Sequence, residues 1–180
     1  MQHVILAVVA LLIVGLTLLV FRWPQGLDKT FSQHAAAQRF TIWYYFALFL
    51  VALPLLMTFV LSWFMPTLRL PGWFGLFVGL AAALQLMVAA IPETGGWKTT
   101  WHRSLTYVSS FFLAPAIILL IASPGINNVA RLVAALCLAI MLGVAVDNVL
   151  GRGHDHILIG QAAYYGAFFA ALLAAAYFNL

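Results

Sequence analysis

Six long runs of apolar residues, separated by shorter polar stretches, dominate the chain. Each run approaches or exceeds the roughly 20 residues that an α-helix needs to cross the hydrocarbon core of a bilayer. The runs cover residues 3–21, 43–64, 73–91, 104–122, 128–149 and 157–178. The pattern predicts an all-α polytopic membrane protein, a bundle of six transmembrane helices forming a single transmembrane domain over residues 1–180.

The first connection between spans, Arg22 to Thr41, is the longest and the most polar. We expect a surface helix within it, with Ser32 as its N-cap, because a serine hydroxyl accepts a hydrogen bond from the first turn of a helix. The first span has no basic stretch before it and no Ala-x-Ala site after it. It is therefore expected to be a retained membrane anchor rather than a cleaved signal peptide.

The composition supports the membrane assignment and limits the classes of molecule that the protein is expected to bind. Hydrophobic residues make up 66% of the chain and charged residues only 7%, against about 25% charged in a soluble domain. A single core of this size could not bury so much apolar surface. The net charge of +4 comes from 8 scattered Lys and Arg, which argues against nucleic acid. Membrane lipids are the expected partners, and a second copy of the chain or another subunit of a membrane complex is a further candidate.

The basic residues predict an orientation. Six of the 8 Lys and Arg fall in the first, third and fifth connections: Arg22, Lys29, Arg39, Lys98, Arg103 and Arg152. Only Arg69 and Arg131 fall in the second and fourth. Because short cytoplasmic loops are enriched in Lys and Arg, the odd-numbered connections are expected in the cytoplasm. Both termini would then lie outside the cytoplasm, and we expect a prokaryotic plasma (inner) membrane.

Polar and titratable residues gather at the same membrane face. All four acidic residues and four of the five histidines lie in or beside the odd-numbered connections: Asp28, Glu93, Asp147, Asp155, His34, His102, His154 and His156. A carboxylate near the end of an apolar span, such as Asp147, is costly unless it is paired or hydrated. Its candidate partners are Arg152, His102 and His156.

Helical spacing extends this polar region into the membrane. His102, Thr106 and Ser109 share one face of the fourth span, and Gln161 and Tyr165 share a face of the sixth. Such stripes should face the interior of the bundle. We expect a polar vestibule lined by the second to sixth spans and open at this face. Its candidate ligand-binding residues are Gln85, Glu93, His102, Thr106, Asp147, His156 and Gln161.

Several chemistries are compatible with these candidate residues. The alternative to all of them is that the residues form no site and are solvated side chains at the ends of loops. His102, His156, Asp147 and Glu93 could hold zinc or iron, which could activate water against a lipid ester or amide. There is no His-Glu-x-x-His pair to support this site. A b-type haem between His102 and His156 is a less favoured alternative. No nucleophile-elbow pattern is present, so catalytic residues stay unassigned.

One stretch resembles a known group of proteins. The matching features, an apolar-Pro-acid turn, a later histidine and an aromatic helix, are Ile91-Pro92-Glu93, His102, Tyr107, Phe111-Phe112 and Pro115. This pattern resembles the third loop and fourth helix of a broad bacterial six-span membrane family of unknown function and, more distantly, the DRAM-like proteins. The resemblance implies a six-helix bundle with Glu93 and His102 in a common site, and it implies no established reaction. The chain departs from the pattern at Gly95-Gly96 and in the basic residues of the loop.

The sequence leaves three functions open. The first is an integral membrane protein that handles a lipid or a small molecule at the His/carboxylate cluster. The second is a metal- or haem-dependent membrane enzyme. The third is a non-catalytic accessory subunit of a membrane complex.

Overall fold

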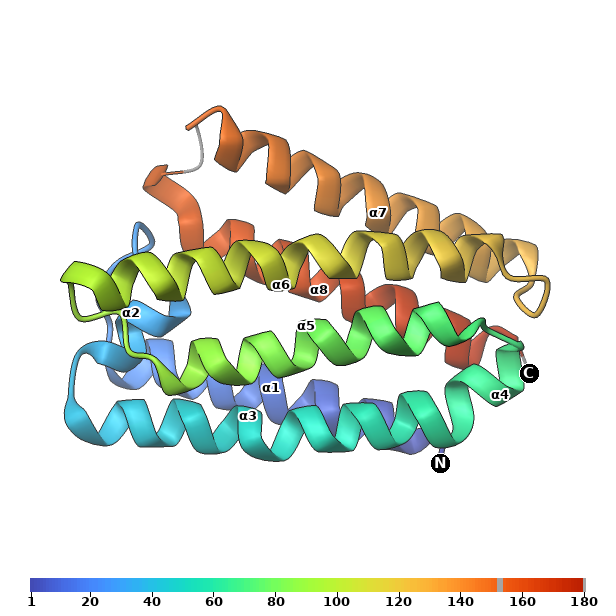
Figure 1. Cartoon of the computed structure of the whole chain (residues 1–180), viewed down its shortest axis with the longest axis horizontal. Coiled ribbons are helices and arrows are strands. Elements are labelled where there is room, and N and C mark those ends of the chain that lie inside the picture. Colours follow the sequence, from blue (N-terminus) through green and yellow to red (C-terminus); the bar gives the residue numbers. More distant parts are fainter. Residues whose placement is uncertain (152–153, 180) are drawn as a thin grey trace.

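The computed structural model describes residues 1–151 and 154–179 (Figure 1). Within that part of the chain the regular elements are all helical. They are α1 (His3–Arg22), α2 (Phe31–Ala36), α3 (Arg39–Phe59), the π-helical stretch η1 (Val60–Phe64), α4 (Met65–Leu68), α5 (Gly72–Ala90), α6 (Gly96–Ala122), α7 (Asn128–Val149), the 3-10 turn η2 (His154–His156) and α8 (Ile157–Tyr177). Six helical stretches are long and apolar enough to cross a membrane. The predicted fold class is confirmed.

Two of these stretches are longer than the apolar runs. The second begins at Arg39 and continues through η1 and α4 to Leu68. It starts early because Gln38 and Thr41 form a capping box ahead of the aromatic run. The fourth begins at Gly96, eight residues before the apolar run, because its first two turns are polar but helical. Hydropathy alone does not detect such turns.

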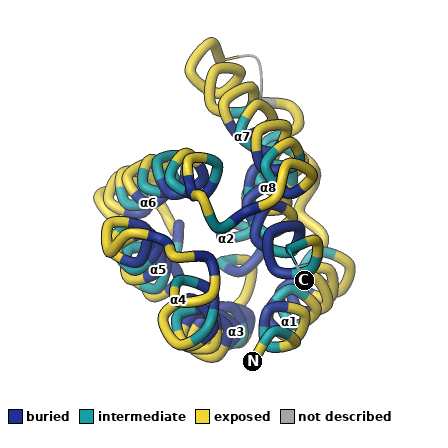
Figure 2. The backbone as a smooth tube through the Cα atoms, turned by 90° about the vertical axis from the view of Figure 1, so that its right-hand side faces the viewer, coloured by how far each residue is buried: buried dark blue, intermediate teal, exposed yellow. Residues whose placement is uncertain are grey.

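The long helices form a ring with one helix outside it. Viewed end-on in Figure 2, α6, α5, α3, α1 and α8 follow one another around the ring, and α2 lies across one end. The helix α7 packs against α8 and α6 from outside. The packing between α1 and α8 is sparse compared with that between α7 and α8. The packing between α6 and α8 is as sparse, but α7 packs against both helices and covers that junction. The ring therefore has one uncovered weak seam, between α1 and α8.

At the end of the bundle opposite α2, side chains donate hydrogen bonds to backbone carbonyls of neighbouring elements. The Ser123 hydroxyl donates a hydrogen bond of 2.7 Å to the Leu68 carbonyl. The Arg131 guanidinium donates to the carbonyls of Ile121 and Ser123 at 3.0 and 3.1 Å. The Ser123 bond joins the end of α4 to the turn between α6 and α7, and the Arg131 bonds tie the start of α7 to the end of α6 and to that turn.

Candidate functional site

The helix α2 turns into the bundle instead of lying on its surface. Thr30 is its N-cap: the Thr30 hydroxyl accepts from Gln33 N at 3.1 Å, and the Gln33 side-chain oxygen accepts from Thr30 N at 2.9 Å. The prediction of Ser32 as N-cap was wrong, because Thr30 with Gln33 completes a capping box two residues earlier. Ser32, His34 and Ala35 are buried. The expected surface position of this helix was therefore also wrong.

His34 anchors the loop that leads into α2. Its side chain is almost fully buried. Its Nδ1 lies 3.1 Å from the Trp23 carbonyl oxygen, and its Nε2 lies 3.1 Å from the Gly26 carbonyl oxygen. The imidazole thus bridges two carbonyls of the loop and holds α2 over the end of the helix ring.

Glu93 is the acceptor of a buried polar network that joins α2 to the start of α6. Its Oε2 accepts from the hydroxyls of Thr30 and Ser32, each at 3.1 Å. Its Oε1 accepts from Arg103 Nε at 2.8 Å and from Gln33 Nε2 at 3.4 Å. The Glu93 side chain is 2% exposed, whereas that of Arg103 is 59% exposed. Of the four acidic residues only Glu93 is buried; the other three are exposed.

His102 lies on the inner face of α6 and is 3% exposed. Its Nδ1 is 2.7 Å from the Ile91 carbonyl oxygen. Because a carbonyl can only accept, Nδ1 carries the hydrogen. Among the described residues Nε2 has no hydrogen-bond partner, and the ring lines the central cavity.

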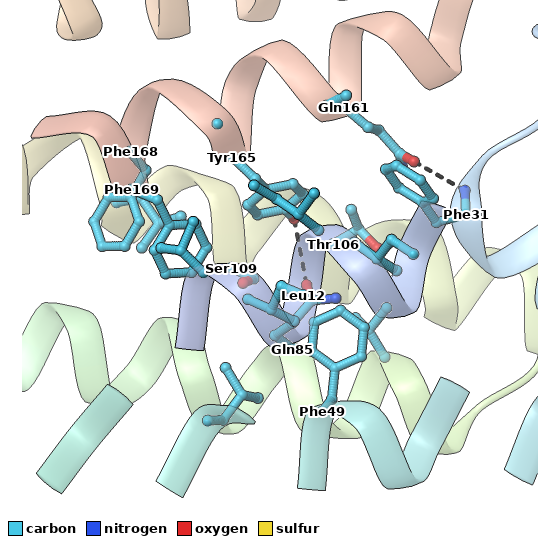
Figure 3. A pocket seen from close by; sticks show the side chains of 18 of the residues that line it. Leu12, Phe31, Phe49, Gln85, Thr106, Ser109, Gln161, Tyr165, Phe168 and Phe169 are labelled. Atoms are coloured by element: carbon cyan, nitrogen blue, oxygen red, sulfur yellow. Dashed lines mark hydrogen bonds between the residues drawn. The ribbon is translucent and has the colours of Figure 1, made fainter. Parts of the chain in front are cut away.

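The cavity inside the ring has a volume of about 630 Å³. Residues of α1, α2, α3, α5, α6 and α8 line it, and most of them are apolar (Figure 3). Its polar lining residues come from the half of the bundle nearest to α2 and from the middle of the bundle: Thr17, Ser32, Tyr45, Gln85, His102, Thr106, Ser109, Gln161 and Tyr165. The cavity is therefore amphipathic along its length, with one polar end and one hydrocarbon end.

Four of the seven predicted ligand-binding residues line this cavity: Gln85, His102, Thr106 and Gln161. All four are also held by neighbours. Gln161 Oε1 accepts from Phe31 N, and the Thr106 hydroxyl donates to the His102 carbonyl. His102 Nδ1 bonds the Ile91 carbonyl, and Gln85 Oε1 accepts from the Tyr165 hydroxyl. Glu93 lies in the adjacent network and does not line the cavity. Asp147 and His156 are exposed and do not line it.

The vestibule differs from its prediction in two respects. It is lined by α1 and not by α7, which lies outside the ring. Phe31 and Ser32 of α2 line the end that was expected to be open. Almost nothing in the sequence indicates that α1 lines the cavity. The inner face of α1 carries a single polar lining residue, Thr17, and a face without a polar stripe cannot be recognised from helical spacing.

The metal and haem hypotheses receive no geometric support. In the described part of the chain, no group of three or more His, Cys, Asp or Glu side chains is arranged to hold a metal ion. The four predicted ligands are therefore not gathered: Glu93 is engaged by Arg103 and hydroxyls, and His156 does not line the cavity that His102 faces. Arg152, the candidate partner of Asp147, lies outside the described residues.

Comparison of the chain with protein-family models, curated proteins and solved structures finds no match. The functional argument therefore depends on the geometry of the cavity and of the buried Glu93 network beside it.

Proposed function

We propose that the protein binds a lipid taken from the surrounding membrane, with its apolar chain along the cavity and its polar head beside His102. The observation that carries the proposal is the amphipathic cavity itself. Its volume falls within the range of about 300–1,000 Å³ typical of ligand pockets. A few convergent polar groups at one end of an apolar pocket are what fix the orientation of such a ligand.

The shape of the cavity favours a chain-like ligand. On α8 the lining extends from Leu158 to Leu173, which corresponds to about 22 Å at the helical rise per residue. A volume of about 630 Å³ spread over about 22 Å gives a mean cross-section of roughly 30 Å². The cavity is thus long and narrow and runs parallel to the helices, as lipid chains do.

The seam between α1 and α8 gives such a ligand access from the bilayer. Ile13 and Phe21 of α1, and Ile159 and Ala162 of α8, line the cavity and are also exposed on the bundle surface. The two helices meet at their far ends, where Gln2 Nε2 donates to the Ala176 carbonyl at 3.1 Å. Phe21, Ile159 and Ala162 belong to the turns of α1 and α8 nearest to α2, so the opening that they border lies beside the polar end of the cavity.

Filling the cavity beside the seam should weaken lipid binding strongly without unfolding the protein. Gly166 lies on α8 in the cavity lining, and a side chain added there meets nothing within 4 Å. We expect Gly166→Leu to reduce the amount of copurified lipid at least about tenfold, equivalent to about 1.4 kcal/mol of binding energy. Native mass spectrometry of the purified protein, with lipid extraction, measures this.

The matched control is Gly143→Leu on α7. Gly143 is also a helical glycine with open space around it, and it does not line the cavity. The control should retain the lipid. Equal lipid content in both variants and in the unmodified protein would contradict the proposal.

We also propose that the face bearing α2 is cytoplasmic, as the basic residues predict. A background without the single cysteine, Cys137→Ala, allows a direct test. Thr94 and Thr67 are exposed at opposite ends of the bundle. In intact cells, a membrane-impermeant maleimide should label Thr67→Cys, and it should label Thr94→Cys only after permeabilisation. The reverse pattern would show the opposite orientation.

A further inference from the structure

We infer that the lipid bound in the cavity has a hydroxyl head, which donates a hydrogen bond to His102 Nε2 and accepts one from the Gln85 side-chain amide. This inference rests on the proposed function and specifies the class of its ligand. It follows from two polar atoms of buried residues that line the cavity, His102 Nε2 and the Gln85 side-chain nitrogen, from their spacing, and from the charge of the cavity lining.

The first atom is His102 Nε2. Nδ1 carries the ring hydrogen, because the Ile91 carbonyl 2.7 Å away can only accept. In the neutral imidazole Nε2 therefore presents a lone pair. The ring is 3% exposed and lines the cavity. Nε2 is thus an acceptor that requires a donor from the ligand.

The second atom is the side-chain nitrogen of Gln85. Its Oε1 accepts a hydrogen bond of 3.3 Å from the Tyr165 hydroxyl, so the nitrogen is the other end of the amide (Figure 3). Gln85 is 8% exposed and lines the cavity, and its side chain also lies within hydrogen-bonding reach of Tyr45. An amide nitrogen carries two hydrogens and can only donate. Gln85 therefore has a hydrogen left to donate to an acceptor on the ligand.

The two atoms lie on neighbouring helices at nearly the same depth. The helices α5 and α6 are antiparallel, and the Ser109 hydroxyl donates to the Ala81 carbonyl at 3.0 Å. In that register the residue of α6 opposite Gln85 is Leu105. His102 is one helical turn from Leu105, or about 4.5 Å along the axis. A single small head group can therefore approach both side chains.

The charge of the lining selects the kind of head group. No Asp, Glu, Lys or Arg lines the cavity in the described part of the chain. A carboxylate or phosphate would enter without a cation to balance it, and burying an unpaired charge is strongly unfavourable. Ester and ketone oxygens accept hydrogen bonds but cannot donate to Nε2. A hydroxyl is a small uncharged group that both donates and accepts, so it satisfies both atoms.

The test compares two probes that differ in one hydrogen-bond donor. Hexadecanol and methyl hexadecyl ether are titrated separately into delipidated, detergent-purified protein, and native mass spectrometry measures bound probe. The ether cannot donate to Nε2. We expect it to bind about tenfold more weakly or worse, because a buried acceptor would lose its partner. His102→Phe should bring the ratio of the two affinities close to one, because it removes the acceptor that only the alcohol can use. Gln85→Leu should weaken both probes and leave the ratio nearly unchanged, because the alcohol and the ether both accept from the amide, and Gly143→Leu should change neither affinity.

The outcomes separate the inference from the function on which it rests. If the two probes bind equally to the unmodified protein and Gly166→Leu abolishes both, the cavity binds lipid chains and the inference is overturned. If neither probe binds, the proposed function itself is overturned. The comparison in the unmodified protein decides the matter even if His102→Phe, which loses the bond to Ile91, fails to fold.

Discussion

Gly125→Ala should lower the free energy of unfolding severely. A Cβ atom at this position would lie 2.1 Å from the Leu68 carbonyl oxygen and 2.6 Å from the Leu68 carbonyl carbon. Both are backbone atoms, so no side-chain rotation relieves the overlap. Inserting one methyl into a packed site costs about 1–3 kcal/mol when side chains can adjust. Here we expect at least the upper end of that range, a large part of a total stability of about 5–15 kcal/mol.

The overlap would also disturb two hydrogen bonds of Ser123, which connect the end of α4 to the turn between α6 and α7. Ser123 Oγ donates to the Leu68 carbonyl and accepts from Gly125 N at 3.1 Å. Moving Gly125 away would break both bonds and shift α7 relative to α4. Thermal unfolding in detergent and the monodisperse fraction on size exclusion measure the effect.

A second glycine substitution provides the comparison for Gly125→Ala. Gly143→Ala adds the same methyl in open space on a helix, where alanine is favoured over glycine by about 1 kcal/mol. It should be neutral or slightly stabilising. A Gly125→Ala protein with a melting temperature equal to that of the unmodified chain would show that the two turns do not pack as the structure describes.

The fold was predictable because the bilayer imposes its requirement locally. Each span must be apolar over the thickness of the membrane and must satisfy its own backbone hydrogen bonds. Both conditions can be evaluated from one stretch of sequence at a time. The same reasoning placed Thr106 and His102 on one face of α6, because helical periodicity is also a local property.

The lateral arrangement of the helices was not predictable in this way. Alternating topology places Asp147 and His156 on the same side of the membrane as His102, but it does not say which helices are neighbours. The position of α7 outside the ring depends on side-chain packing between segments distant in sequence. For that reason Asp147 and His156 were assigned to a site that they do not reach.

The inward position of α2 in the first connection could not be predicted for a different reason. Its residues are polar, and polar segments beside a span usually lie at the interface. Glu93 changes this outcome, because one buried carboxylate accepts hydrogen bonds from Thr30, Ser32 and Gln33. Recognising that α2 folds inward would have required pairing residues that are about 60 positions apart.

Glu93→Ala should release α2 from the end of the cavity. The substitution removes four hydrogen bonds to a carboxylate that is almost fully buried. Hydrogen bonds to charged groups contribute about 1.5–3 kcal/mol each when measured singly. The donors on α2 can regain water, so we expect a net loss of about 2–3 kcal/mol in the free energy of unfolding. Hydrogen exchange should become faster across residues 27–37 than elsewhere.

Arg103→Ala separates the carboxylate network from the ion pair. The Arg103 side chain is 59% exposed, and ion pairs with a solvent-accessible partner are worth about 0–1 kcal/mol. We therefore expect this variant to lose little stability and to leave exchange in α2 nearly unchanged. Equal effects from Glu93→Ala and Arg103→Ala would indicate that the ion pair, and not the hydroxyl and amide donors of α2, holds the network together.

The release of α2 should also change how long a lipid stays bound. Phe31 and Ser32 line the polar end of the cavity only while α2 is held in place. In Glu93→Ala the head of the ligand would be exposed to the interface, so its dissociation should be faster while Gln85 and His102 still select a hydroxyl. Dissociation of hexadecanol and its affinity ratio to the methyl ether test these effects separately. A faster off-rate with an unchanged ratio would assign retention to Glu93 and selection to the cavity wall, whereas loss of the ratio would show that α2 also shapes the selective site.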